Sequence, residues 1–288
     1  SEAGGCGGRR DRQRRAEGRA LRGGYDRAFV LPNSLKSALI PFWAGVPVRT
    51  GWRGEMRYGL LNDVRKLDKD RYPLMVQRFV ALALDADAPP PALDSIQPPR
   101  LRVDSDAVAA ARADQRLADD RPVLGLCPGA EFGPSKRWPE YHYAAVARHW
   151  IEQGGRVWLF GSAKDRPVAE QIIDALPDAQ RGEAAILAGA TSLEQAVDLL
   201  SVTDAVVSND SGLMHIAAAL GRPLVAVYGS TSPGFTPPLG EAVAIERLGL
   251  ECSPCFQREC PLGHLNCLRQ LEPDRVIQAL ARLPGVPR

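Results

Sequence analysis

The residues best placed to bind an anion follow one apolar run of the sequence, in the order Asn209, Asp210, Ser211, Gly212, Leu213, Met214 and His215. A buried strand that ends in this small polar turn and continues into a helix exposes the first backbone N–H groups of that helix. Together with the positive end of the helix dipole, these groups form an anion site. Gly212 lets a phosphate approach the backbone, and His215 lies one turn later on the face that includes Ser211. We therefore predict a nucleotide-diphosphate site; the alternative is a capped helix start in which His215 packs in the core.

Charged loops follow two other apolar runs. One loop extends from Pro128 to Pro139 and carries the cations Lys136 and Arg137 directly before a helix. Cations at the carboxyl end of a strand can neutralise a diphosphate, although a solvated basic turn would look the same in sequence. The other loop carries Asp165, whose carboxylate would take ribose hydroxyls or cap the helix that follows.

Four cysteines gather near the C-terminus in a C-x2-C-x4-C-x6-C pattern, at Cys252, Cys255, Cys260 and Cys267, with His264 between the last two. The first pair suits a zinc site, but the remaining spacings match no standard zinc module. We favour reduced thiols in a tight loop over structural zinc. No constellation of carboxylates and histidines accompanies the thiols, so we expect no catalytic metal and no other cofactor.

The elements that must position these loops alternate regularly after residue 100. Apolar, strand-like runs occupy 123–127, 156–160, 185–188, 205–208 and 224–228, and helical segments 141–153, 167–176, 193–200 and 213–220 lie between them. Short buried strands that alternate with helices predict a parallel sheet covered on both faces. We predict a Rossmann-like, doubly wound α/β domain over 101–288, with its ligand at the carboxyl ends of the strands.

The first hundred residues are less regular. A strand at 26–32, a helix at 35–44, a strand at 46–51 and a helix at 75–84 predict the remnant of a second α/β domain over residues 25–100. The proline-rich stretch 85–100 is its linker. Residues 1–24 hold seven arginines and seven glycines without an apolar stripe, which predicts a disordered leader. A nucleic-acid-binding arm is disfavoured because no aromatic residue interleaves these arginines.

The composition argues against several classes of protein. It is 45% apolar and 24% charged with a net charge of only +2, which is ordinary for a globular protein and gives no reason to expect a nucleic-acid partner. No apolar run reaches the roughly 18–20 residues that cross a bilayer, so we expect no membrane-spanning segment. No signal peptide is visible, which predicts a cytoplasmic location.

Long stretches of the chain resemble one known family. LCPGAEFGPSKRWP, SNDSGLMHIAAALGRPLVAVYGSTSPG and CSPCFQRECPLGHLNCL are similar to the nucleotide-binding half of the ADP-heptose:lipopolysaccharide heptosyltransferases, glycosyltransferase family 9. VLPNSLKSALIPFWAGVPVRTGWRGEMRYGLLN resembles the acceptor-side half of the heptosyltransferase II group. The likeness extends from about residue 25 to the end of the chain.

The resemblance implies a GT-B fold, in which two Rossmann-like domains face each other across a cleft, here with an incomplete N-terminal domain. It implies an inverting glycosyltransferase that moves L-glycero-D-manno-heptose from ADP-heptose to the first heptose of the inner core, on lipid A–Kdo. That acceptor lies at the inner leaflet of the inner membrane, so the enzyme would be cytoplasmic or peripheral at that face. The alternatives are transfer of the first or third heptose and an inactive remnant that only binds ADP.

The resemblance also implies roles for individual residues on the donor side. Lys136 would bind the diphosphate and Asp210 the hydroxyls of the donor sugar. The phosphates would lie against Ser211, Gly212 and His215. Asp165 would take the ribose, and the segment from Leu187 to Gly189 would border the adenine.

Charge alone suggests the acceptor side. Inner-core acceptors carry Kdo carboxylates, and arginines bind carboxylates in a bidentate manner. The cations expected to contact the acceptor are Lys36, Arg49, Arg53 and Arg57. A solvated basic face is the alternative.

One feature of the family has no counterpart in the sequence. Its members begin with a strand that runs into a glycine-containing loop, and an aspartate in this loop is the expected general base. Residues 1–24 show no such strand, so Asp11 is not assigned and the catalytic residue stays unknown. The sequence therefore predicts a chain that is N-terminally truncated or frame-disrupted.

Overall fold

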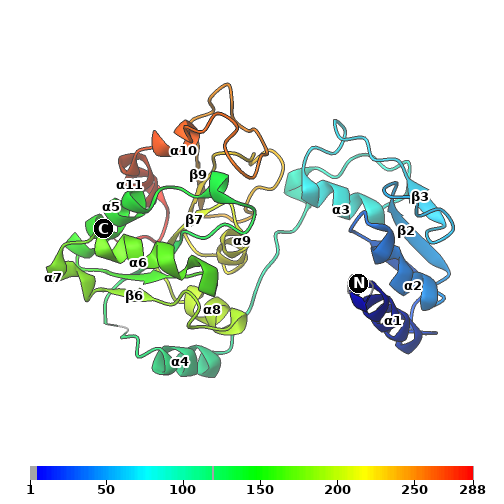
Figure 1. The fold of residues 1–288 in the computed structure, drawn as a ribbon, viewed down its shortest axis with the longest axis horizontal. Helices are drawn as coiled ribbons and strands as arrows, with labels where there is room; N and C mark the ends of the chain where they lie inside the picture. The colour runs from blue at the N-terminus through cyan, green and yellow to red at the C-terminus, as the bar shows by residue number, and fades with distance from the viewer. Residues whose placement is uncertain (1–4, 119, 288) are drawn as a thin grey trace. The chain divides into compact units, whose positions relative to one another are not determined.

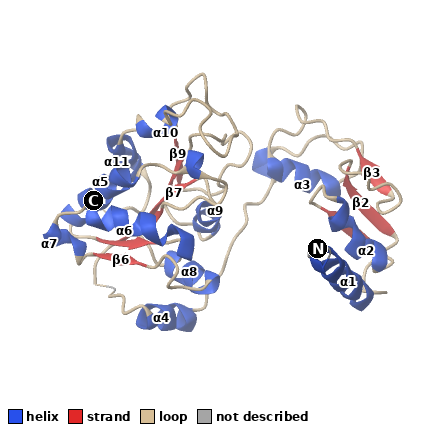
Figure 2. Ribbon diagram, in the orientation of Figure 1, coloured by secondary structure: helices blue, strands red, loops and turns tan. Residues whose placement is uncertain are grey.

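The computed structural model describes residues 5–118 and 120–287, and for residues 5–12 it describes the backbone only. The chain divides into two compact units (Figure 1). Unit 1 comprises the residues up to Gln97 together with Gly234–Thr236, and unit 2 comprises Pro98–Pro233 and the residues from Pro237 onward. Each unit contains a β-sheet accompanied by helices (Figure 2).

Unit 1 is built on a three-stranded parallel sheet in the order β1-β2-β3. Its elements are β1 (Arg27–Val30), η1 (Leu35–Ala38), α2 (Leu39–Trp43), β2 (Val48–Trp52), β3 (Asp63–Arg65), α3 (Met75–Ala83) and η2 (Leu93–Ser95). The two strands and two helices predicted between 26 and 84 are therefore confirmed. β3 was not predicted because it is three residues long and polar; Asp63 accepts a hydrogen bond at 2.8 Å from Thr50 of β2.

The prediction of a disordered leader is wrong for residues 5–20, which form helix α1 (Gly5–Ala20), while residues 1–4 lie outside the described part. α1 packs on α2 through Gly18, where a Cβ atom would lie 2.8 Å from the Ile40 carbonyl oxygen and 2.9 Å from the Trp43 Cβ. The Arg15 guanidinium lies 5.6 Å from the Trp43 ring centroid. Arg22 donates to the Trp43 carbonyl at 3.2 Å. An apolar stripe is absent because the contact uses a glycine backbone and arginine side chains.

Unit 2 contains a six-stranded, all-parallel sheet in the order β6-β5-β4-β7-β8-β9. The strands are β4 (Val123–Cys127), β5 (Arg156–Leu159), β6 (Ala184–Ile186), β7 (Ala205–Asn209), β8 (Leu224–Val227) and β9 (Val243–Glu246). The five predicted strands are confirmed, and β9 adds a partly exposed edge. Counted within the unit the order is 3-2-1-4-5-6, the doubly wound order in which the chain reverses between β4 and β7.

Helices cover both faces of this sheet (Figure 1). They are α4 (Ser105–Asp114), α5 (Glu140–Glu152), α6 (Arg166–Asp174), α7 (Asp178–Arg181), α8 (Leu193–Leu200), α9 (Gly212–Ala219), α10 (Asn266–Arg269) and α11 (Pro273–Arg282), with the short turns η3 (Pro134–Lys136) and η4 (Ala163–Asp165). Alternate residues of each strand enter two cores: Leu124 and Leu126 pack toward α5, α6 and α11, whereas Val123 and Cys127 pack toward α4, α8 and α9. Because successive side chains of a strand enter one core and then the other, both faces of the strand are buried. The strands therefore appear in the sequence as continuous apolar runs.

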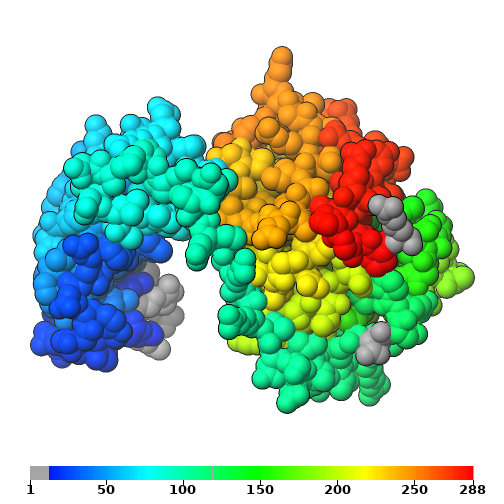
Figure 3. Space-filling model, turned by 180° about the vertical axis from the view of Figure 1, so that it is seen from behind, coloured from blue at the N-terminus to red at the C-terminus, as the bar shows by residue number. Residues whose placement is uncertain are grey.

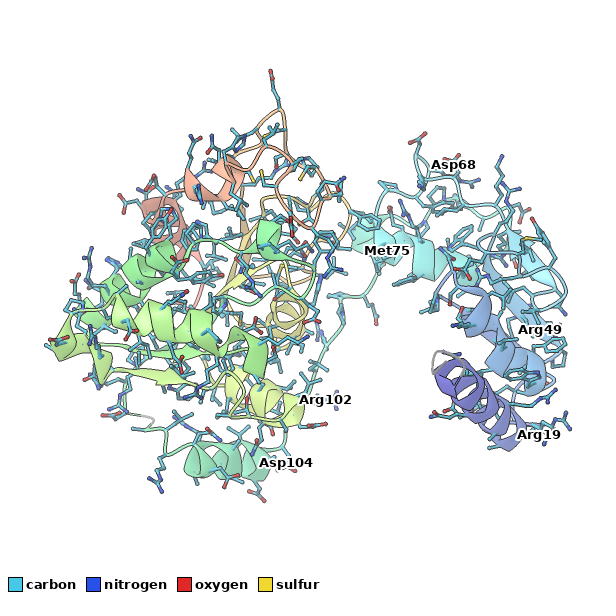
Figure 4. All side chains as sticks on the ribbon, viewed as in Figure 1. Arg19, Arg49, Asp68, Met75, Arg102 and Asp104 are labelled. Carbon is cyan, nitrogen blue, oxygen red and sulfur yellow. The ribbon has the colours of Figure 1, made fainter. Side chains whose placement is uncertain are left out.

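Two helices missed in the sequence have clear local causes. α4 begins at Asp104, labelled in Figure 4, whose carboxylate accepts from the Asp106 backbone N–H at 2.7 Å. α11 buries Val276, Ala279 and Leu280 along one face and exposes the other. Among the residues that the structure describes, no helix has the length and apolarity needed to cross a bilayer.

The packing of α1 on α2 generates a testable prediction. Replacing Gly18 by Val forces a side chain into the Ile40 carbonyl and the Trp43 Cβ, and overpacking of this kind costs about 1–3 kcal/mol. We expect faster amide hydrogen exchange throughout α1 and α2 in Gly18→Val. Gly24→Ala is the control, since its new Cβ would meet only the Leu21 carbonyl at 3.7 Å. Unchanged exchange in Gly18→Val would show that α1 does not pack on α2.

Candidate functional site

The loops after β4 and β7 are joined by Asn209, a side chain with 0% exposure at the end of β7. Its Oδ1 accepts from the Trp138 backbone N–H at 3.1 Å and from the Tyr143 hydroxyl at 3.0 Å. Its Nδ2 donates to the Pro128 carbonyl at 2.6 Å. One amide thus fixes both ends of the β4–α5 loop against β7. Sequence reasoning gave Asn209 no role of its own; the only signal was a polar side chain at the last position of a buried strand.

Lys136 and Asp210 meet at the point of chain reversal between β4 and β7. Lys136 Nζ lies 2.6 Å from Asp210 Oδ2 and 3.4 Å from the Asp210 carbonyl oxygen. The same Oδ2 accepts from the Thr231 hydroxyl, in the loop after β8, at 2.6 Å. Asp210 is only 6% exposed, so the pair is shielded from water on the carboxylate side. A buried carboxylate of this kind requires such partners to remain ionised.

His215 belongs to the same cluster through α9. Burial lowers the pKa of its imidazole; Asp210 acts in the opposite direction, and Lys136 lowers the pKa further. The imidazole is therefore neutral near pH 7 and lies within electrostatic reach of both partners of the ion pair. The structure brings together Lys136, Asp210 and His215, which sequence analysis had placed on two separate loops.

A cavity of about 510 Å³ lies at the carboxyl ends of the strands; its wall includes Ser211, the chain neighbour of Asp210, but not Lys136, Asp210 or His215 themselves. Its wall includes Gly129 and Glu131 after β4, Gly161, Ser162 and Asp165 after β5, Thr191, Ser192 and Leu193 after β6, and Ser211, Gly212 and Ile216 from the start of α9. The volume and the mixture of aliphatic and polar lining suit a small organic ligand. Ser211 and Gly212 therefore occupy the predicted position, at a helix start that faces a cavity.

The predicted adenine-side residues are placed differently. Leu187 packs in the core below the sheet end, and Gly189 is exposed in a turn with φ of +73° that lies against Ala163. Neither residue lines the cavity; the segment that does so begins two residues later, at Thr191. Their place beside an adenine stays a prediction; the strand β6 ends earlier than its apolar run suggests.

Asp165 lines the cavity, but its carboxylate is engaged within its own loop. Oδ2 accepts from the Ser162 backbone N–H at 2.9 Å and from the Ser162 hydroxyl at 2.7 Å. Oδ1 lies 3.8 Å from the Arg137 guanidinium. These contacts favour the alternative in which Asp165 shapes the turn that starts α6, rather than a free acceptor for ribose hydroxyls.

Two of the four cations predicted to bind an acceptor are structural. Arg57, 2% exposed, donates to the carbonyls of Pro32 at 2.6 Å and of Trp52, and burial lowers its pKa. Arg49, labelled in Figure 4, donates to the carbonyls of Val46 and Leu60, each at 2.6 Å. Burial leaves Arg57 little surface for an acceptor, and for Arg49, which is half-buried, the acceptor role stays a prediction.

Lys36 and Arg53 differ from these two arginines. Both are exposed on unit 1, so their role in binding an acceptor stays a prediction.

The four clustered cysteines are free thiols and line one small cavity together with His264.

Asp11, which has no assigned role, has its side chain outside the described residues.

Comparison with known proteins identifies the family. The model of glycosyltransferase family 9 (heptosyltransferase) matches residues 14–266. The chain belongs to this family. The match starts inside α1, so residues 14–24 are part of the family's domain and not of a leader, and the resemblance begins earlier than residue 25.

Two curated relatives share much of this sequence. Lipopolysaccharide heptosyltransferase 2 of Salmonella typhimurium is 52% identical over 94% of this chain and 79% of its own length. Lipooligosaccharide heptosyltransferase 2 of Haemophilus influenzae is 55% identical over 80% of this chain and 68% of its own length. Among solved structures, ADP-heptose lps heptosyltransferase II of E. coli is 50% identical, with a TM-score of 0.83 over 93% of this chain and 80% of that chain. The GT-B fold class predicted from sequence is therefore confirmed for this glycosyltransferase.

Asn209 gives a prediction about stability. Asn209→Ala leaves the Trp138 N–H, the Tyr143 hydroxyl and the Pro128 carbonyl without their partner, and buried unpaired groups cost about 1–3 kcal/mol each. We expect the free energy of unfolding from urea denaturation to fall by about 2–4 kcal/mol. Gln195→Ala is the control, because Gln195 also makes two side-chain hydrogen bonds, to Ser192 and Asp114, but at the surface. A loss no larger than in Gln195→Ala would contradict the role given to Asn209.

His215 gives a prediction about pH. Its pKa is lowered in the folded protein, so below pH 6.5 the unfolded chain takes up a proton that the folded chain does not. The stability due to neutral His215 is present above its unfolded pKa and is lost as the pH falls from that value toward the folded pKa. NMR titration of the imidazoles should show His215 protonating below pH 6.5, and added ADP should raise its pKa. The signal of His149, exposed on α5, should not respond to ADP. If the pKa of His215 were not lowered and did not change when ADP is added, this would argue against a diphosphate at this place.

Proposed function

We propose that this chain is an inverting glycosyltransferase that moves L-glycero-D-manno-heptose from ADP-heptose to the first heptose of the inner core, on lipid A–Kdo. The observation that carries the proposal is the pair Lys136–Asp210, at 2.6 Å, beside a helix start that faces a cavity of about 510 Å³. The names of the relatives that are at least 50% identical support two parts of this proposal: that the donor carries heptose, and that the heptose transferred is the second of the inner core.

The donor would bind across the reversal point of the unit 2 sheet. In this arrangement the nucleoside fills the cavity between Ser162, Ser192 and Ile216. The diphosphate lies against the free N–H groups at the start of α9, where Gly212 has no Cβ to hinder approach. The size of the cavity suits a nucleoside, and the nearby cation Lys136 suits a diphosphate. Together they favour a nucleoside diphosphate as the ligand.

Lys136 would act on the leaving group. Its Nζ is held in place by Asp210 before a donor binds, and a phosphate oxygen can take over part of that charge-assisted interaction. As the bond between heptose and phosphate breaks, negative charge grows on the diphosphate, and a fixed ammonium with helix N–H groups stabilises that charge. In this proposal the donor is activated by the protein's own groups, with ADP-heptose as a substrate and no metal ion or cofactor in contact with it.

Asp210 and His215 would orient the donor. Once Lys136 turns to phosphate, the Asp210 carboxylate keeps its hydrogen bond from Thr231 and has acceptor capacity for sugar hydroxyls. The neutral imidazole of His215 can donate one hydrogen bond to a phosphate oxygen without the cost of burying another charge.

The acceptor would be recognised through unit 1. Lys36 and Arg53 are exposed cations there, and the Kdo carboxylates next to the acceptor heptose are their natural counterparts. Because the acceptor is a lipid, we propose that the enzyme works in the cytoplasm, at the inner leaflet of the inner membrane. Peripheral contact through the acceptor would suffice for this.

Lys136→Ala tests the donor site. Loss of a shielded cation at a diphosphate costs about 2–3 kcal/mol, so we expect ADP to bind about 30–150-fold more weakly by calorimetry. Transfer should fall at least in proportion. Lys69→Ala is the control, since Lys69 is an exposed lysine of unit 1. Equal ADP affinity in Lys136→Ala and the original chain would refute the donor site.

Transfer itself is measured with ADP-heptose and defined acceptors. We expect release of ADP and a lipid heavier by one heptose when lipid A–Kdo already carries one heptose. Product only on the acceptor without heptose, or only on the one with two, would assign the chain to another transferase of the family. ADP binding without product on any acceptor would leave a nucleotide-binding protein.

A further inference from the structure

Four thiols from one segment converge at a place that the donor site does not use. The segment runs from Leu250 to Leu268 and forms part of the surface of unit 2, in orange in Figure 3. All four are free thiols: Cys252, Cys255, Cys260 and Cys267. They line a single cavity of about 20 Å³, which has the size of one small atom or ion.

The thiols lie close enough to act on one another. Four thiolates in one small cavity would repel one another, since like charges at short range are unfavourable. Several thiolates can coexist at this place only when a cation lies among them. The arrangement therefore favours either four neutral thiols or a bound metal ion.

The chain turns tightly after Cys260, and Cys260 and Cys267 line the same small cavity. Gly263 contributes the turn, with φ of +71° and its N–H donating to the Cys260 carbonyl at 3.0 Å.

The cysteine segment is also fastened to the loop that carries Lys136. Ser135, the neighbour of Lys136, donates its hydroxyl to the Gln257 carbonyl at 2.5 Å and its N–H to the Arg258 carbonyl at 3.2 Å. Phe256 donates its N–H to the Ser230 carbonyl at 2.7 Å, one residue before Thr231. The segment thus supports both groups that hold Asp210.

We propose that Cys252, Cys255, Cys260 and Cys267 bind one thiophilic metal ion of the Zn²⁺ class, and that this ion fixes the segment against Ser135 and Lys136. Four sulfur ligands from a short loop suit a tetrahedral ion. On binding, four metal–sulfur bonds form and the thiol protons pass to solvent. Among the described residues no three ligands already surround one point at metal distance, so the thiols close on the ion as it binds. His264 is a poorer ligand, because its Nδ1 accepts from the Asn266 N–H at 3.0 Å.

Metal content and thiol protection test the site without reference to activity. The chain is purified under reducing conditions, loaded with Zn²⁺, desalted and analysed by mass spectrometry for metal. We expect about one ion per chain after loading. Zinc or iron already present in the purified protein would support the site equally. Alkylation of the native protein should spare the four cysteines, and a chelator should make them reactive while Cys6, in α1, stays unchanged.

Variants complete the test. Cys255→Ser and Cys260→Ser should each lose most of the bound metal, whereas the matched control Cys6→Ser should retain it. If a cysteine variant does not fold, the chelator experiment on the unmodified chain decides. Less than about a tenth of an ion per chain after loading, together with alkylation rates that ignore Zn²⁺, would overturn the proposal. So would disulfides between these cysteines in protein kept under argon.

The link to Lys136 rests on the proposed function, so ADP binding is measured separately. Removal of the ion should weaken ADP binding by roughly ten-fold or more, because misplacing a positioned group by about 1 Å costs up to ~100-fold. Equal ADP affinity with and without the ion would refute the link and leave the metal site. No ADP binding in the metal-loaded chain would instead refute the proposed function, since the metal is measured without nucleotide.

Discussion

The ion pair between Lys136 and Asp210 is the interaction on which the candidate site depends. It connects the loop after β4 to the loop after β7, at the place where the sheet order reverses. Its carboxylate is almost fully buried, and a charge in that position is tolerated only with partners; Lys136 and the Thr231 hydroxyl supply them. The neighbouring amide of Asn209 ties the same two loops together through uncharged hydrogen bonds.

This construction suits a protein that must bind a highly charged donor and then release it. A lysine left unpaired at the cavity would be solvated and mobile, and ordering it would reduce the affinity for the donor. Paired with Asp210, the ammonium is already in position, and in the proposed donor site an incoming diphosphate would replace one anionic partner by another. The cysteine segment and Ser135 restrict the same loop from its other side.

The arginines of unit 1 show how little charge alone says about ligand binding. Arg57 and Arg49 have the residue type expected of a carboxylate-binding site, yet their guanidinium groups hold backbone carbonyls of the loops around β2. A guanidinium carries five donors in a fixed geometry, so it serves equally well as an internal crosslink. Burial separates the two uses, and burial depends on which segments surround the side chain.

The sequence by itself determined the doubly wound sheet of unit 2 and the loops that carry Lys136, Asp210 and His215, because buried strands and helix starts have local signatures. It did not reveal α1 or β3, whose residues lack an apolar pattern and pack on α2 and β2, nor β9, a short edge strand that pairs with β8. Only the tertiary structure decided that Lys136 and Asp210 meet, that Arg57 is buried, and that the four cysteines line one small cavity. Each of these facts depends on how the elements pack: the contact between Lys136 and Asp210 joins residues 74 positions apart, and burial follows from the segments that surround a side chain.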